Sequence, residues 1–302
     1  MNIFNFTTHF SSENACREHF KEERDKIGIK CKKCGHEEHF WIKSRWSYEC
    51  KKCRSRTSLR SGTVMQGSNL PFLVWYKTMF LMTTTKKGFS SKEIQKQLGL
   101  KRYEPVWAMV HKLRKAMGNR DDRYTLEGMI EMDEGYFTVE SSEIEKAKGK
   151  RGRGAAGKSN VAIMAESSQL EDIETGEKSS QCRYFKAKVL DTHLANEINE
   201  TVKESFEETS IVLTDDSTSY VDISKYVELH VSEKSSNDLT KETLRWVHIT
   251  ISNAKRNLLG NYHKIKGKYL QLYLNEFVYK LNRRYFGDKL FDRLIIASIT
   301  GL

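Results

Sequence analysis

Two aspartates occupy positions at which a carboxylate is unfavourable unless something binds it. Asp133 lies inside the apolar stretch GMIEMDEGYFTV, and Asp215 ends the apolar stretch TSIVLTDD. A buried carboxylate needs a cation or hydrogen-bond donors. If both stretches are neighbouring strands, the two carboxylates could hold divalent ions about 4 Å apart, the arrangement used for phosphoryl transfer. A salt bridge or a helix cap would explain Asp216, but a metal site explains Asp133 and Asp215 together better.

Four cysteines have the spacing of a second kind of metal site. The sequence CKKC occurs twice, at Cys31 and Cys34 and again at Cys50 and Cys53, with fifteen residues between the pairs. Two thiolates on each of two facing turns can close a tetrahedron around zinc. A redox pair is the alternative, and duplication of the motif argues against it. The intervening EEHFWIKSRWSYE alternates aromatic residues, which predicts a β-hairpin and therefore a zinc ribbon.

Positive charge is concentrated in the first 123 residues. The 302-residue chain carries 51 Lys and Arg against 40 Asp and Glu, a formal net charge of +11. Residues 1–123 hold 26 basic and 12 acidic residues, a net of +14, and the remainder holds 25 and 28, a net of −3. This asymmetry favours contact between the N-terminal part and a nucleic acid over an evenly solvated surface.

The segments after the cysteines predict helices. LPFLVWYKTMFLMTTT has a proline near its start and a helical apolar face. FSSKEIQKQLGL begins with a capping box, Ser90 and Glu93, and stops at Gly99. With the basic helix of YEPVWAMVHKLRKAM this predicts a helix-turn-helix, although a plain helical hairpin has the same pattern. The candidate DNA-binding residues of the third helix are Lys112, Arg114 and Lys115.

From about residue 124 the pattern becomes mixed. Strands are predicted in GMIEMDEGYFTV, KSNVAIMAES, QCRYFKAKVL, TSIVLTDD and YVELHV, with a helix in THLANEINETVKESF after the third. Helices are predicted around residues 248–261 and 269–284. Strands interleaved with helices indicate an α/β domain built on a sheet, which must position Asp133 and Asp215.

Six stretches together resemble one protein family. They are CKKCRSRTSLRSGTVMQGSNLP, EMDEGYF, RGRGAAGKSNVAI, TDDSTSY, HITISNAKRNLLGNYH and YLQLYLNEFVYKLNRR. Over nearly its whole length the chain resembles the ISXO-like transposases of bacterial and archaeal insertion sequences, insertion-sequence family 1595. The resemblance implies an RNase H-like catalytic fold of the DDE type, in which Asp133 and Asp215 are the first and second catalytic acids.

The same resemblance points to a third residue. In this family the third position falls seven residues before the lysine of a Lys-Arg pair, here Lys255 and Arg256, which gives His248. Members carry Glu, Asn or His there, so the chain resembles the DDH kind. We expect Lys255 and Arg256 themselves to contact DNA.

The basic, glycine-rich loop KAKGKRGRGAAGK is either a solvated linker or an arm that contacts the DNA backbone, and the sequence does not decide between the two.

Two other residues compete with His248 for the third ligand. Asn253 follows it by five residues, and Glu276 is a carboxylate, which is a more natural ligand for magnesium than imidazole. Glu276 also belongs to a family pattern of a glutamate with basic residues four and seven positions later, expected to meet phosphate. Those residues are Lys280, where the family usually has Arg, and Arg283. His263 matches a family motif too, and we expect it to be structural or to face DNA.

Three segments are expected. Residues 1–62 form an N-terminal segment and zinc ribbon, residues 63–123 a helix-turn-helix-like DNA-binding region, and residues 124–302 the RNase H-like catalytic domain. Structural Zn²⁺ and catalytic Mg²⁺ or Mn²⁺ are the expected cofactors. The expected partners are the terminal inverted repeats and target DNA, bound by a homo-oligomer.

The expected activity is transposition, in which both element ends are cut and their 3′-hydroxyls are joined to target DNA. The alternative is a DNA-binding regulator whose sheet domain is inactive. The start, MNIFNFTTHF, has neither a basic segment nor an apolar run, and no stretch approaches the roughly 20 apolar residues of a membrane span. We therefore expect a cytoplasmic, nucleoid-associated protein.

Overall fold

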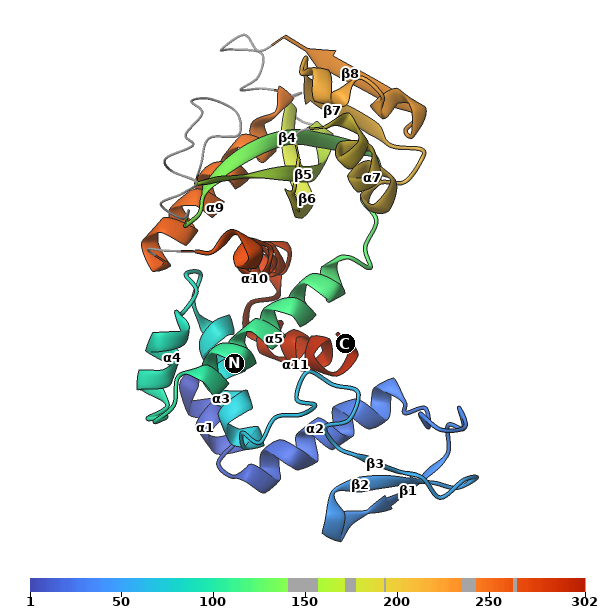
Figure 1. The fold of residues 1–302 in the computed structure, drawn as a ribbon, viewed down its shortest axis with the longest axis vertical. Helices are drawn as coiled ribbons and strands as arrows, with labels where there is room; N and C mark the ends of the chain where they lie inside the picture. Colours follow the sequence, from blue (N-terminus) through green and yellow to red (C-terminus); the bar gives the residue numbers. More distant parts are fainter. Residues whose placement is uncertain (141–156, 172–177, 193, 235–242, 263–264, 302) are drawn as a thin grey trace. The chain divides into compact units, whose positions relative to one another are not determined.

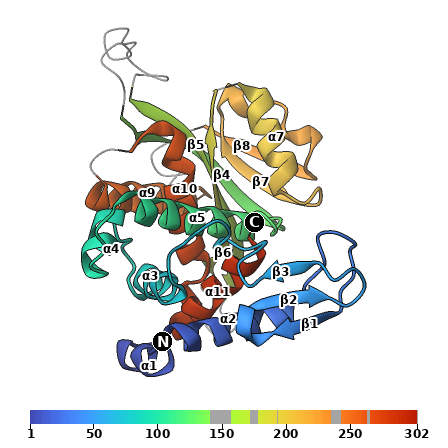
Figure 2. The same ribbon diagram turned by 60° about the horizontal axis from the view of Figure 1, so that its bottom comes forward.

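The computed structural model describes residues 1–140, 157–171, 178–192, 194–234, 243–262 and 265–301. They form two compact units, Met1–Arg120 with Arg283–Leu302, and Asp121–Asn282. Each unit has its own sheet and its own helices (Figures 1 and 2). Loop 146–158 lies mostly outside the described residues, and His263 lies outside them entirely, so the expectations for both remain untested.

The first unit combines helices with a small antiparallel sheet. Its sheet has the order β1-β2-β3. Its strands are β1 (His39–Ile42), β2 (Ser47–Cys50) and β3 (Arg56–Ser58). Its helices are α1 (Ile3–His9), α2 (Glu13–Ile27), α3 (Phe72–Thr84), α4 (Ser91–Gln97), α5 (Glu104–Asp121, which ends at the unit boundary) and α11 (Leu290–Thr300). The predicted hairpin is confirmed, because β1 and β2 pair antiparallel.

Aromatic side chains join the two ends of the chain within this unit. Phe6 of α1 stacks on Phe80 of α3 with ring centroids 4.4 Å apart, and it meets Phe291 of α11 at 5.7 Å. Ring pairs at these separations contribute beyond their buried area. The C-terminal helix α11 therefore packs with α1 and α3, although sequence reasoning grouped residues 124–302 into one segment.

Helix α2 is attached to the small sheet by cations over aromatic rings. Lys21 lies 5.2 Å from the ring centre of Trp41, and Arg24 lies 5.6 Å from that of Tyr48. Arg24 is buried and also donates to the Ser58 carbonyl at 3.1 Å. Residues three positions apart on a helix share a face, so one face of α2 covers one face of the sheet.

The predicted capping box is present. The Glu93 N–H donates to the Ser90 hydroxyl, and the Ser90 N–H donates to the Glu93 carboxylate. Gly99 ends this helical segment with a φ of +62°, a conformation that favours glycine. Helices α4 and α5 thus form at the two predicted places, separated by a short turn.

The second unit is built on a five-stranded mixed sheet with the order β6-β5-β4-β7-β8. The pairs β4–β5 and β5–β6 are antiparallel, whereas β4–β7 and β7–β8 are parallel. Its strands are β4 (Met129–Thr138), β5 (Lys158–Glu171), β6 (Lys178–Leu190), β7 (Ile211–Asp215) and β8 (Leu229–Glu233). Its helices are α7 (Ala195–Ser205), α9 (Arg245–Asn261) and α10 (Leu270–Asn282). All five predicted strands are confirmed.

Alternation along β4 divides the sheet into two buried faces. Ile130 and Met132 belong to the hydrophobic core that includes Ile198 of α7. Phe137 belongs to the opposite core, with Val247 of α9. Successive strand side chains point to opposite faces, so α7 covers one face while α9 and α10 cover the other (Figure 1).

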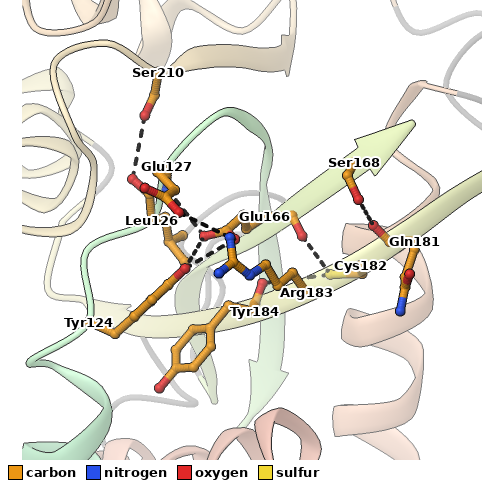
Figure 3. A network of polar contacts seen from close by, with 10 residues as sticks. All are labelled: Tyr124, Leu126, Glu127, Glu166, Ser168, Gln181, Cys182, Arg183, Tyr184 and Ser210. Atoms are coloured by element: carbon orange, nitrogen blue, oxygen red, sulfur yellow. Dashed lines mark hydrogen bonds and ion pairs between the residues drawn. The ribbon is translucent and has the colours of Figure 1, made fainter. Parts of the chain in front are cut away.

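A buried carboxylate on the α7 side fixes the entry to β4 (Figure 3). Glu166 accepts hydrogen bonds from the Tyr124 hydroxyl at 3.0 and 3.1 Å and from the Glu127 N–H at 3.2 Å. Arg183 lies 3.5 Å from the same carboxylate. Buried charges are tolerated when they are hydrogen-bonded and paired, so this network is structural.

Among the described helices, none is long and apolar enough to cross a membrane.

Candidate active site and metal centre

The four cysteines of the two CKKC motifs lie together in the first unit. Their sulfur atoms all lie within 4.8 Å of one another. The Sγ atoms of Cys31 and Cys53 are 3.5 Å apart, and those of Cys34 and Cys50 are 3.6 Å apart. A tetrahedral zinc with Zn–S bonds of about 2.3 Å requires sulfur separations of about 3.8 Å. The four residues therefore fit a zinc ion.

The two cysteine turns have matching backbones. The residue after the second cysteine of each motif has a left-handed conformation: Gly35 follows Cys34 with a φ of +72°, and Arg54 follows Cys53 with a φ of +58°. Glycine adopts this conformation easily, whereas arginine does so rarely. Arg54 also pairs with Glu49 of β2 at 3.5 Å. The two turns thus present their thiols in the same way.

Backbone amides prepare one thiol for metal binding. The N–H groups of Cys34 and then Lys33 lower the pKa of Cys31 to about 6. Thiolate is the form that binds metal, so the lowered pKa of Cys31 favours its metal-binding form. A divalent cation would stabilise the remaining thiolates.

Asp133 and Asp215 lie on the same face of the second unit's sheet. Strands β4 and β7 run parallel, and their last registered pair is Glu131 with Leu213. The same register, extended by two residues, aligns Asp133 with Asp215. Side chains two apart share a face, so both carboxylates lie on the face covered by α9.

His248 reaches this face from the first turn of α9. Its Nε2 lies 3.2 Å from Oδ2 of Asp133. The hydrogen bond to Asp133 raises the pKa of His248 above its usual value against the opposing effect of partial burial, and the charges of Asp133, Glu131 and, least, Asp215 add to the rise. The histidine and both aspartates therefore share one electrostatic environment.

Two of the three expected ligands, His248 and Asp133, are spaced for a divalent ion, and Asp215 lies farther out. Adjacent ligands of an octahedral ion with bonds of about 2.1 Å lie about 3 Å apart, close to the separation of His248 Nε2 and Asp133 Oδ2. Among the described residues, only the four cysteines form a group of three or more His, Cys, Asp or Glu side chains whose ligand atoms all lie within 4.8 Å of one another. Asp133, Asp215 and His248 do not form such a group. Asp215 must therefore move closer before all three residues can share one ion.

Alternate residues of β4 meet α9 at positions that advance along the helix. Glu131 Oε2 accepts hydrogen bonds from the backbone N–H groups of Trp246, at 2.7 Å, and Val247, at 3.1 Å. Asp133 meets His248. Farther along, a Cβ atom added to Gly135 would lie 3.3 Å from Ile251, and Lys255 lies over the ring of Phe137 at 5.7 Å.

Sequence reasoning assigned no role to Glu131. The residue is buried, with 4% of its surface exposed, and burial raises its pKa to about 7 against the lowering effect of the Val247 and Trp246 amides. The available signal was a glutamate two residues before Asp133 in an apolar strand, which places both carboxylates on one face.

The two competing ligands have different surroundings. Glu276 lies on α10 and is 4% exposed, with its Oε1 atom 3.8 Å from the Lys280 ammonium. Asn253 is exposed on α9. The ion pair partly neutralises the Glu276 carboxylate, which makes Lys280 a partner of this glutamate as well as a candidate phosphate contact.

The other basic residues expected to contact DNA differ in exposure. Arg256 is exposed on α9, and Lys115 is exposed on α5. Lys112 donates to the Gln66 carbonyl at 2.6 Å. Arg114 is fully buried, with 0% of its surface exposed, so it does not offer a guanidinium to DNA in this structure.

Arg283 follows α10 and belongs to the first unit, whereas Glu276 and Lys280 belong to the second. Glu276 and Lys280 therefore form a pair within the second unit, and Arg283 is not part of that unit. The family pattern had grouped all three residues.

Comparison with known families identifies part of the chain. Residues 125–282, more than half of the chain, match the family model described as the ISXO2-like transposase domain. A comparison with curated proteins gave no match. The matched region contains Asp133, Asp215, His248 and Glu276.

Proposed function

The chain belongs to the ISXO2-like transposase family, and we propose that it is the DNA transposase of an insertion sequence. In this proposal it binds the terminal inverted repeats, cleaves both element ends and joins the resulting 3′-hydroxyls to target DNA. Membership of the family implies an enzyme that acts on DNA. The recognition of particular ends and the sequence of cleavage and joining are the parts that we propose.

We infer that the second unit, Asp121–Asn282, has the RNase H-like fold that the family resemblance implies for this part of the chain. Two features of the second unit support this. Three antiparallel strands, β6, β5 and β4, continue into two parallel strands, β7 and β8. The two aspartates lie on the adjacent strands β4 and β7, where their carboxylates can serve a common reaction.

The observation that carries the proposed active site is the approach of His248 to Asp133. A helix and a strand from distant parts of the sequence bring these side chains within 3.2 Å, on the face shared with Asp215. We propose that Asp133, Asp215 and His248 would hold Mg²⁺ or Mn²⁺. Such ions, when bound, supply the polarisation of the phosphate and the activation of the nucleophile in two-metal phosphoryl transfer.

The chain's own residues have two further tasks in this proposal. Strand β4 and helix α9 would hold Asp133 and His248 close together before an ion binds, which lowers the cost of assembling these two ligands during the reaction. Lys255 and Arg256, on the same helix as His248, would bind DNA phosphates next to the reacting bond. Lys280 and Arg283 are proposed as additional phosphate contacts.

DNA recognition is proposed for residues 1–123, divided into the zinc ribbon of residues 1–62 and the helix-turn-helix-like region of residues 63–123. The net charge of +14 in this part supports the proposal, since neutralising phosphates supplies most of the affinity for DNA. We assign contacts to Lys112 and Lys115. Arg114 is omitted because its side chain is buried.

A cleavage assay with a binding control tests the function. The full-length protein is mixed with DNA carrying the flanking ends of its own gene, in Mg²⁺ or Mn²⁺. The transposase proposal expects nicking at the element ends by the wild-type chain and binding without nicking by Asp133→Asn. Binding without any nicking by the wild-type chain in either metal would instead support the DNA-binding regulator.

A further inference from the structure

The first turn of α9 is capped by a residue from another element. Leu244, which precedes the helix, contributes no side-chain cap. The Trp246 and Val247 N–H groups instead donate to one oxygen of Glu131 on β4, at 2.7 and 3.1 Å. The first N–H groups of a helix have no partner within the helix. A carboxylate there satisfies two of them and interacts favourably with the helix dipole.

This cap differs from a local one in what it fixes. A serine or aspartate at the start of the helix would define where α9 begins without attaching it to the sheet. Glu131 attaches the first turn to the same face of β4 that carries Asp133. The next residue after Val247 is His248, so the attachment lies directly beside the histidine.

The neighbouring contacts define the approach of the two elements. Gly135, four residues after Glu131, faces Ile251, because a Cβ atom at this position would lie 3.1 Å from the Phe137 ring and 3.3 Å from the Ile251 side chain. The glycine permits this close approach, but it does not determine the position of the helix along the strand. The two directed hydrogen bonds to Glu131 can determine that position.

We propose that Glu131 is a positioning residue that holds the first turn of α9 on β4 and so places His248 against Asp133. The proposal rests on the proposed function to the extent that His248 is taken as a metal ligand. Outer partners that orient metal ligands commonly change metal affinity or activity by about 10–100-fold when removed. Glu131 would act in this way through the backbone of the helix.

A matched pair of variants separates the cap from the volume of the side chain. Glu131→Gln keeps an oxygen that accepts hydrogen bonds, whereas Glu131→Met has a similar length and no such oxygen. Glu166→Met is the control, because Glu166 is also buried and hydrogen-bonded but pairs with Ile130, on the opposite face of the sheet. All variants are made in the full chain and assayed below their unfolding temperatures.

The first measurement is hydrogen exchange at the Trp246 and Val247 amides, which does not depend on activity. We expect protection in wild type and Glu131→Gln, and exchange at least about tenfold faster in Glu131→Met, as expected for loss of the bonds that protect the amides. The second is the Mn²⁺ concentration for half-maximal DNA nicking. It should rise about 10–100-fold in Glu131→Met and remain near wild type in Glu131→Gln and Glu166→Met.

The outcomes separate this proposal from the one on which it rests. Unprotected amides in wild type, or an unchanged Mn²⁺ requirement in Glu131→Met, would overturn the positioning role. If Glu131→Met does not fold, the wild-type chain and Glu131→Gln are compared instead. Protected Trp246 and Val247 amides in wild type, with an unchanged Mn²⁺ requirement in Glu131→Gln, support the cap. A tenfold rise in the Mn²⁺ requirement of Glu131→Gln overturns it. If His248→Ala nicks DNA like wild type, the proposed ligand fails, while the exchange data still report on the cap.

Discussion

His248 Nε2 lies 3.2 Å from Oδ2 of Asp133, so one proposed metal ligand is hydrogen-bonded to another. Without an ion, this contact stabilises the protonated imidazole. With an ion, the proton must leave so that both side chains can face the metal. The contact thus links ligand geometry to pH.

The identity of the third ligand can be tested with two variants. His248→Ala should lower DNA nicking by more than about 100-fold, because even outer partners of a metal site change activity by about 10–100-fold. Glu276→Gln should retain more activity, since its carboxylate already lies 3.8 Å from Lys280. The nicking rates of both variants, measured in Mg²⁺ and in Mn²⁺, decide whether His248 or Glu276 is the third ligand. The reverse pattern, an active His248→Ala and an inactive Glu276→Gln, would assign the metal to Glu276.

The ligand type also predicts a preference between metals. Mg²⁺ prefers oxygen ligands, whereas imidazole suits transition metals better. The wild-type chain should therefore nick DNA at lower Mn²⁺ than Mg²⁺ concentration. His248→Glu should keep some activity and shift towards Mg²⁺. Titration of both proteins with both metals measures this, and an unshifted preference in His248→Glu would exclude the imidazole as a ligand.

Activity should fall on acidification in a window set by His248. A free histidine has a pKa near 6.5, and the hydrogen bond to Asp133 raises the pKa of His248 further. The protonated form is therefore favoured below and somewhat above pH 6.5, and nicking should increase as pH rises through this region. Higher Mn²⁺ should move the rise to lower pH by competing with protons. An identical acid limb in His248→Glu would show that another group sets it.

The zinc site should account for one ion per chain and for the fold of the small sheet. Cys50→Ser removes one of four sulfurs that lie within 4.8 Å of one another. Structural zinc supplies about 10–16 kcal/mol in small zinc modules, so its loss should unfold β1–β3 and leave the second unit folded. Metal analysis and limited proteolysis measure both effects. Freshly purified wild-type protein without zinc would contradict the assignment.

Local patterns were sufficient for much of the fold. The alternation around Asp133 predicted a strand, and β4 spans Met129–Thr138. The Ser90 capping box predicted the start of α4, which begins at Ser91. The cysteine spacing predicted four neighbouring sulfurs. Each of these features depends on residues close together in sequence or on a spacing that the metal itself requires.

Features that depend on distant residues were not predictable in this way. Helix α9 was expected from residue 248 but begins at Arg245, because its first amides are capped by Glu131 from β4. Thr243, beside Leu244, is a residue type that often caps helices, but its hydroxyl donates to Glu233 at 2.8 Å. The packing of α11 with α1 and α3 likewise depends on Phe291 meeting aromatic rings from the other end of the chain.

Substitutions of two adjacent basic residues on α5 should change different properties, DNA binding for Lys115 and stability for Arg114. Lys115 is exposed and Arg114 is fully buried. Lys115→Gln should weaken DNA binding and reduce the slope of log K against log salt by about 0.9, as expected for one lost phosphate contact, with little change in stability.

Arg114→Gln should lower the free energy of unfolding by about 1–3 kcal/mol, because it disrupts buried polar interactions. Its salt slope should stay near wild type. Salt titrations of binding and denaturant unfolding measure both variants, and a reduced salt slope in a stable Arg114→Gln would show that this side chain becomes exposed to bind DNA.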